Sequence, residues 1–370
     1  YLVENQPEAA AQMLRTLLER HPESPERAEA FRILAEALKK MGDAEMARRA
    51  YLKYLDAFPD DSGAPEVMVA VAESYAANGE MLKAVETCGR LLERWPESPQ
   101  ACRAAVFRAR TLAGIGEFAR ALEALRDVRA RHGADLGADL PEVEFLTGMC
   151  LAKTGRVEES AAMLTGFLER YRSTPHAPEA YYAVGECLKD LKDYLGAARM
   201  FQKLIRSHPD HAKAGPAMLK LAECYRALDL PGMAGDSLRQ YLDAQPKDAV
   251  QDDLVLQAAR DMLDAGRVNA STQVLLRLSP STDAWKAVEG RLLRCRGMLF
   301  QGLYPQAEKE LLSVVDTANA AEQRDVALRM LGDCYTQMGR LDLAARAYMG
   351  LAEAEAGKGG REKDAATGDL

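Results

Sequence analysis

The chain has 370 residues, which is enough for a large buried core or for two ordinary domains. Its 56 acidic residues outnumber its 48 basic ones, and the formal net charge of −8 argues against general affinity for nucleic acid, which requires a basic surface. No run of about 18 apolar residues occurs, so the sequence predicts no membrane-spanning helix. We therefore expect neither a nucleic-acid partner nor a direct membrane span in these residues.

One short pattern recurs along the chain and predicts a helical hairpin. In its clearest copy, Ala72 and Tyr75 precede Gly79 at helical spacing, a second apolar face resumes at Ala84, and Pro96 closes it. The turn residue marks each copy, and in chain order these turn markers are Gly42, Gly79, Gly116, Gly155, Lys192, Asp229, Gly266, Gly302 and Gly339. Their spacings are 37, 37, 39, 37, 37, 37, 36 and 37 residues, which predicts an all-α chain of stacked antiparallel hairpins.

The two ends of the chain depart from complete hairpins. Residues 1–24 align with the second helix of the pattern, so they predict a truncated first hairpin in a piece of a longer protein. The apolar residues that a preceding hairpin would cover offer a surface for self-association. Complete hairpins run to residue 352, which predicts one continuous solenoid over residues 1–352. Residues 353–370 are rich in glycine and charge, and they predict the end of the last helix followed by a flexible tail.

Small residues at two registers predict close packing inside each hairpin. Seven positions before the markers stand Ala35, Ala72, Ala109, Gly148, Gly185, Ala222, Ala259, Cys295 and Gly332. Five positions after the markers stand Ala47, Ala84, Ala121, Ser160, Ala197, Ala234, Ser271, Ala307 and Ala344. Small side chains on both helices let the two backbones approach closely. The hairpins near Gly116, Gly155 and Gly302 are less regular, and we expect a local shift of packing there.

The pattern of small residue, larger residue, turn glycine, alanine and closing proline resembles the tetratricopeptide repeat (TPR) family. Phe118 and Tyr194 match the aromatic residue that often follows the turn in this family. The resemblance implies a right-handed solenoid of about nine and a half repeats, with a period longer than the usual ~34 residues. It also implies a non-catalytic scaffold that binds a peptide or partner domain on a concave face lined by the first helices. Connectors such as Arg-His-Pro-Glu-Ser-Pro look like those of bacterial envelope TPR proteins. The sequence favours neither the periplasm or cell envelope nor the cytoplasm as the compartment.

No converging set of titratable residues predicts an enzyme, a metal site or a cofactor. The seven cysteines include no CxxC pair, and we expect them to be small buried hydrophobes. Four of them share one register, five residues before the marker: Cys150, Cys187, Cys224 and Cys334. His21, His132 and His208 fall at the ends of second helices, where a histidine favours the negative end of the helix dipole.

Two registers of the first helices define a candidate partner-binding surface. Ten residues before the markers, seven consecutive hairpins carry an apolar residue: Val69, Val106, Phe145, Tyr182, Leu219, Leu256 and Leu292. Six residues before the markers, every position except Met149 is charged, and the charged residues include Glu36, Glu73, Arg110, Glu186, Glu223, Arg260 and Arg296. The two registers lie one helical turn apart on one face, so they predict an apolar floor beside a charged row that holds an extended segment or a helix of a partner. The alternative is that the apolar register only packs neighbouring first helices together.

These observations leave three hypotheses for the function. The first is a peptide-binding or domain-binding module, in a bacterial envelope or secretion assembly. The second is an architectural spacer or a self-associating rod. The third is the recruitment arm of an enzyme whose catalytic domain lies outside these residues. Neither surface register contains Lys or Asn, which argues against the carboxylate clamp of chaperone-binding family members.

Overall fold

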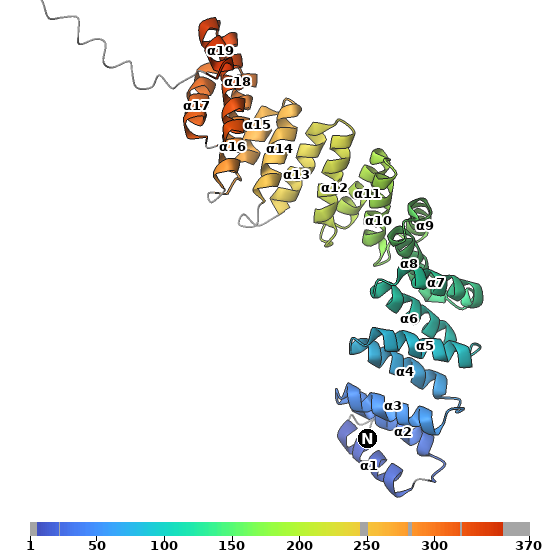
Figure 1. Cartoon of the computed structure of the whole chain (residues 1–370). Coiled ribbons are helices and arrows are strands. Elements are labelled where there is room, and N and C mark those ends of the chain that lie inside the picture. Colours follow the sequence, from blue (N-terminus) through green and yellow to red (C-terminus); the bar gives the residue numbers. More distant parts are fainter. Residues whose placement is uncertain (1–5, 22, 245–250, 280–282, 319, 351–370) are drawn as a thin grey trace, which may run out of the picture. The chain divides into compact units, whose positions relative to one another are not determined.

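The computed structural model describes residues 6–21, 23–244, 251–279, 283–318 and 320–350. Within these ranges every regular element is a helix, namely nineteen α-helices and one short 3-10 helix (Figure 1). The predicted all-α class is therefore confirmed. The chain divides into two compact units, residues 1–187 and 188–370, and each is described by itself. The tail predicted for residues 353–370 lies outside the described residues, and the single continuous solenoid over residues 1–352 stays a prediction.

Unit 1 begins with α1 (Pro7–Arg20), which packs against α2 in the manner of a second helix of a hairpin. Four hairpins follow in the described residues, each made of two helices packed together: α2 (Arg27–Lys40) with α3 (Ala44–Ala57), α4 (Ala64–Ala77) with α5 (Met81–Arg94), α6 (Ala101–Gly114) with α7 (Phe118–His132), and α8 (Leu140–Lys153) with α9 (Val157–Arg170). The 3-10 helix η1 (Gly137–Asp139) precedes α8, and α10 (Ala177–Asp190) spans the boundary between the units.

Unit 2 continues with α11 (Tyr194–Ser207), which packs against α12. Its hairpins are α12 (Ala214–Ala227) with α13 (Pro231–Ala244), α14 (Asp252–Asp264) with α15 (Val268–Leu275), α16 (Ala284–Phe300) with α17 (Tyr304–Thr317), and α18 (Ala321–Gln337) with α19 (Leu341–Tyr348). Among the helices of the described residues, none is both long enough and apolar enough to cross a membrane.

The nine turn markers all adopt the left-handed backbone conformation that the sequence predicts for them. The seven glycines have φ between +71° and +84°, and Lys192 and Asp229 adopt φ of 63° and 58° without the freedom of glycine. At the turn after α4, the amide of Glu80 donates to the carbonyl of Tyr75 over 2.9 Å, which closes the helix end. Each hairpin therefore turns for the same local reason, whichever residue stands at the marker.

The small residues of the two packing registers are buried throughout the described hairpins, which confirms their predicted role. Two contacts show how tight this packing is. The hydroxyl of Ser160 on α9 donates to the carbonyl of Gly148 on α8 over 2.8 Å, and Ser271 on α15 donates to Ala259 on α14 over 2.9 Å. A Cβ atom placed on Gly148 would lie 2.4 Å from a side-chain carbon of Leu164. A larger residue at either register would force the two helices of a hairpin apart.

The cysteines are small buried residues as predicted, since six of the seven are buried and Cys102 is half-buried. Burial raises the pKa of Cys88 and of Cys295 to about 12, and that of Cys150 to about 11. These thiols are therefore protonated at neutral pH, and they serve as packing groups rather than as nucleophiles.

Candidate functional site

The apolar register of the first helices is mostly buried. Five of its seven members are 8 % exposed or less: Val69, Val106, Phe145, Leu256 and Leu292. The other two, Tyr182 and Leu219, are half-buried. Phe145 shows what the buried members do, because its ring stacks on His176 with the centroids 4.6 Å apart. Five members thus contribute chiefly to packing, and contact with a partner stays a prediction for all seven.

The charged register of unit 1 forms ion pairs between successive first helices. Glu73 of α4 is hydrogen-bonded to Arg103 of α6. Arg110 of α6 binds Glu142 of α8 in a bidentate pair, with 2.7 Å between Nη2 and Oε2. These side chains are partly exposed, so each pair contributes little to stability and mainly orders the surface.

The charged register of unit 2 is paired as well. Arg260 of α14 donates to Glu289 of α16 over 2.7 Å, and Arg296 donates to Asp264 over 2.8 Å. Glu223 accepts from Lys189 over 2.9 Å. Burial raises the pKa of Glu223, but hydrogen bonds from Lys189 and Lys220 outweigh this effect and hold the pKa below its ordinary value. Glu186, the remaining predicted charged residue near the unit boundary, is half-buried.

Three partners of this register share a position that sequence reasoning missed. Arg103, Glu142 and Glu289 each stand thirteen residues before a turn marker. Each carries the opposite charge to the residue six before the preceding marker, and this sign relation is the signal that would have found them. In these three cases, the residue six before one marker forms an ion pair with the residue thirteen before the next marker. Each pair therefore joins two neighbouring first helices.

A hollow of about 450 Å³ opens on the first-helix face of unit 1, and we call it the α2–α4 hollow. It contains the predicted residues Val69 and Glu73 and several charged residues that sequence reasoning did not single out. Its lining comes from α2, α3, α4 and α6, and comprises Arg32, Glu36, Lys39, Lys40, Tyr51, Glu66, Val67, Val69, Ala70, Glu73 and Arg103.

Four of the seven charged residues that line the α2–α4 hollow form no ion pair within the described residues, whereas Arg32 pairs with Glu29 over 3.5 Å. Within the described residues, Glu36, Glu66, Lys39 and Lys40 form no ion pair, unlike Glu73 and Arg103 at the edge of the same hollow. Burial raises the pKa of Tyr51, and the nearby carboxylates of Glu36 and Glu66 raise it further. The phenol is therefore protonated at neutral pH, and it is a hydrogen-bond donor in the same hollow as these two carboxylates.

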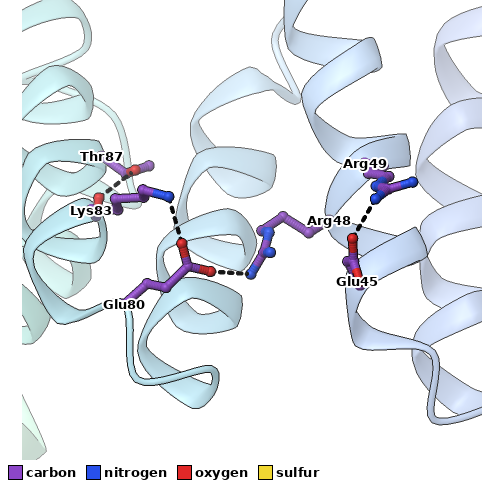
Figure 2. A network of polar contacts seen from close by, with 6 residues as sticks. All are labelled: Glu45, Arg48, Arg49, Glu80, Lys83 and Thr87. Atoms are coloured by element: carbon purple, nitrogen blue, oxygen red, sulfur yellow. Dashed lines mark hydrogen bonds and ion pairs between the residues drawn. The ribbon is translucent and has the colours of Figure 1, made fainter.

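A polar network holds α3, which carries Tyr51, against the next hairpin (Figure 2). Arg48 of α3 pairs with Glu80 over 3.1 Å, and Lys83 of α5 donates to the same carboxylate over 2.6 Å. The guanidinium of Arg48 also lies 4.7 Å from the ring centroid of Tyr75. One carboxylate thus joins two cations from different helices, which fixes the wall on which Tyr51 lies.

No arrangement of residues in the described part of the chain suggests metal chemistry, because no group of three or more His, Cys, Asp or Glu lies together there. His21 and His208 cap the C-terminal ends of α1 and α11, and His132 is the last residue of α7. These are the helix-end positions expected from the sequence.

Comparison with known proteins agrees with the repeat pattern. The family described as Tetratricopeptide repeat matches residues 1–62, 34–99, 108–166 and 145–212, which together make up more than half of the chain. No curated protein sequence matches the chain.

Solved structures of similar proteins include a tetratricopeptide repeat protein from Parabacteroides merdae, which is 12 % identical with a TM-score of 0.47 and covers 73 % of this chain and 98 % of its own. The apo form of RapI is 13 % identical with a TM-score of 0.47, covering 88 % of this chain and 96 % of its own. YrrB, described as a TPR protein with an unusual peptide-binding site, is 22 % identical with a TM-score of 0.44, covering 56 % of this chain and 98 % of its own.

The helical hairpins, their left-handed turns and their small-residue registers define an α-solenoid of stacked hairpins. The chain belongs to the tetratricopeptide repeat family. TPR repeats generally form non-catalytic scaffolds that bind protein or peptide partners, and this general function is the one that the chain's repeats support.

Proposed function

We propose that the first-helix face of unit 1 binds a segment of a partner protein at the α2–α4 hollow. The observation that carries this proposal is the set of free charges there. Glu36, Glu66, Lys39 and Lys40 have no ion pair within the described chain, whereas Glu73, the next charge along this face, is paired. Charges left free around one hollow are available to a ligand at no cost of breaking internal pairs.

The lining indicates the chemistry of the partner segment. A lysine or arginine of the partner fits between Glu36 and Glu66, and a partner carboxylate fits Lys39 or Lys40. The protonated hydroxyl of Tyr51 can donate to a backbone carbonyl of the segment. The occupant is thus an extended segment that carries both signs of charge, with only small apolar residues against Ala70.

Selection of binding peptides from a displayed random library tests this proposal. We expect the selected peptides to share a basic residue and an acidic residue at a fixed spacing. The double variant Glu36→Lys, Glu66→Lys should weaken their binding at least ~30-fold, since two attractive contacts become repulsive. Glu123→Lys, an exposed carboxylate on α7, makes the matched control and should leave binding unchanged. Peptides that bind both variants equally well would show that the hollow is not the site.

The half-buried members of the apolar register, Tyr182 and Leu219, are the further positions at which a partner contact can be tested. Tyr182→Asp and Leu219→Asp should reduce partner binding without unfolding the protein, because neither side chain is fully buried. Circular dichroism of each variant checks folding before binding is measured. Folded variants with normal binding would restrict the partner site to the α2–α4 hollow.

We propose a bacterial envelope or secretion assembly as the setting to test first. Connector sequences such as Arg-His-Pro-Glu-Ser-Pro, residues 20–25, support this choice. Fractionation of the source cells, followed by detection of the protein with an antibody, tests it. Recovery in the cytoplasmic fraction alone would exclude that setting.

A further inference from the structure

A second and larger hollow of unit 1, about 910 Å³ in volume, lies where α5, the connector after it, α6 and α7 meet. We call it the α5–α7 hollow, and it shares no lining residue with the α2–α4 hollow. Its volume falls in the range of about 300–1,000 Å³ that is common for small-molecule sites. Its apolar walls come from three helices and are Leu92, Ala105, Ala124 and Val128.

The hollow exists because two large side chains of the preceding junction are replaced here by smaller ones. Moving back by the repeat length of 37 residues, Ala105 corresponds to Met68 and His132 corresponds to Trp95. Met68 is 9 % exposed and Trp95 packs against the same buried cluster, so together they fill the junction of α3, α4 and α5. In the α5–α7 hollow the same space is empty, and a Cβ atom on Gly89 in its wall would meet no other atom within 4 Å.

Two residues that line the hollow each have one buried polar atom without a hydrogen-bond partner. In the described structure, Nε of Arg108 and Oγ of Ser98 are both inaccessible to solvent and form no hydrogen bond. Burial raises the pKa of Cys88 to about 12 and Arg108 opposes that shift, which places its guanidinium near this buried thiol. A half-buried cation without a counterion is costly, and the preceding junction has Val71 at this position.

The mouth of the hollow is charged, mostly negative, and unpaired. The exposed charged side chains at the mouth are Glu93, Glu97, Asp127, Arg131 and Asp135. None of them forms an ion pair within the described residues. At the preceding junction, the residues that correspond to Arg131 and Glu97 are joined over 2.6 Å, as Arg94 and Asp60. The two junctions thus carry charges of the same sign at these positions, and they form an ion pair at the preceding junction but none at the mouth of the α5–α7 hollow within the described residues.

We propose that the α5–α7 hollow binds a free aromatic amino acid of the size of tryptophan. The aromatic ring occupies the volume that Trp95 and Met68 fill in the preceding junction. The carboxylate pairs with the guanidinium of Arg108, which lines the hollow and forms no ion pair within the described residues. The ammonium group lies toward the carboxylates at the mouth, among them Glu93 and Asp127. This site is independent of the partner segment proposed for the α2–α4 hollow.

Calorimetric titration of the full chain with three related compounds tests the assignment. Tryptophan carries both charged groups, tryptamine lacks the carboxylate, and indole-3-propionate lacks the ammonium group. We expect tryptophan to bind at least ~10-fold more tightly than tryptamine, because a buried hydrogen bond to a charged group is lost. The loss for indole-3-propionate should be smaller, since the carboxylates at the mouth are exposed to solvent.

Two variants separate the parts of the site. Arg108→Met should lower the affinity for tryptophan to that for tryptamine, and it should leave the affinity for tryptamine unchanged. Ala105→Met restores the residue type of the preceding junction and should abolish binding of all three compounds. Arg110→Met, on the same helix but paired with Glu142 outside this hollow, is the matched control and should bind tryptophan normally.

Circular dichroism and thermal unfolding establish that each variant is folded. Failure of tryptophan to bind the native chain at millimolar concentration would overturn the proposal. Binding that survives both Arg108→Met and Ala105→Met would also overturn it, because the ligand would then lie elsewhere.

Discussion

Two successive hairpin junctions of unit 1 share one backbone pattern and differ in how they are filled. At the α3–α4–α5 junction, Met68 and Trp95 pack in one cluster, and Arg94 at the end of α5 pairs over 2.6 Å with Asp60 of the connector between α3 and α4. At the α5–α6–α7 junction, Ala105 and the half-buried His132 leave a hollow of about 910 Å³. The repeat registers therefore set where helices meet, while side-chain volume at two positions decides whether a junction is closed.

The two junctions also differ in the polar contacts near their turns. Arg48, Glu80 and Lys83 form the network of Figure 2 at the closed junction. At the hollow junction Val85 replaces Arg48, and Glu117 pairs only with Arg120, at 4.0 Å, in the described structure. An ion-pair network between helices thus holds the turn end of the closed junction, and the corresponding residues of the hollow junction form no such network within the described structure.

The largest effect is expected from opening the closed junction. Met68→Ala should lower the free energy of unfolding by about 2 to 4 kcal/mol, because it removes buried apolar volume and leaves a cavity. Urea unfolding followed by circular dichroism measures this loss. A change below about 1 kcal/mol would show that the neighbouring side chains collapse into the space, and would remove the contrast between the junctions.

A smaller effect is expected from the connector of the closed junction. Tyr54 is fully buried and its hydroxyl donates to Asp61, which also accepts from the amide of Gly63 over 2.8 Å. Tyr54→Phe should cost about 1 kcal/mol at pH 7. The hollow junction has Leu91 and Ser98 at the corresponding positions and makes no such bond.

This contribution should depend on pH in a defined direction. The hydrogen bond from Tyr54 lowers the pKa of Asp61 below its ordinary value of 3.8, so the folded chain binds fewer protons than the unfolded chain there. The stabilisation is complete above that ordinary value and is lost as the pH falls through the lower folded pKa. The difference in the free energy of unfolding between the native chain and Tyr54→Phe, measured by urea unfolding, should therefore shrink as the pH falls from 7 towards 3. A constant difference would contradict the pairing.

Filling the hollow junction should stabilise the protein, which is the opposite of the effect expected for Met68→Ala. Ala105→Met is expected to raise the free energy of unfolding by about 1 kcal/mol, since it buries apolar surface in existing space. The same urea measurement applies, with Ala124→Gly as a control that enlarges the hollow and should destabilise. Destabilisation by Ala105→Met would mean that the methionine side chain meets a wall and that the space is narrower than described.

The smallest effect is expected at the mouths of the junctions. Arg94→Gln should cost about 0.5 kcal/mol or less, because both partners of the Arg94–Asp60 pair are largely exposed. Arg131→Gln, at the corresponding unpaired position, should change the stability still less. Thermal unfolding at low and high salt resolves the two, and the Arg94 effect should vanish at high salt. Equal effects of both substitutions would show that the mouths do not differ.

Much of the fold was accessible from the sequence, because it depends on local rules. The nine turn markers predict the left-handed residues, and even Lys192 and Asp229 adopt that conformation where the repeat requires it. The small-residue registers predict which positions are buried between paired helices. These features repeat with a nearly constant period, so one hairpin predicts the next.

The candidate sites were less accessible, because they depend on differences between hairpins. The sequence placed Val69 and Glu73 on one face but did not reveal that Val69 is buried or that Glu73 is paired with Arg103. The α5–α7 hollow arises because two large side chains are absent together. Neither replacement, considered alone in the sequence, predicts a hollow. Which charges remain unpaired is a property of three-dimensional neighbours, and no periodic pattern records it.

Reciprocal exchange between the two junctions tests this account most directly. One double variant, Ala105→Met with His132→Trp, gives the hollow junction the side chains of the closed one, and the other, Met68→Ala with Trp95→His, does the reverse. We predict that thermal unfolding shows the first variant to be more stable than the native chain and the second to be less stable. A loss of stability in both variants would contradict the claim that side-chain volume at these two positions decides whether a junction is filled.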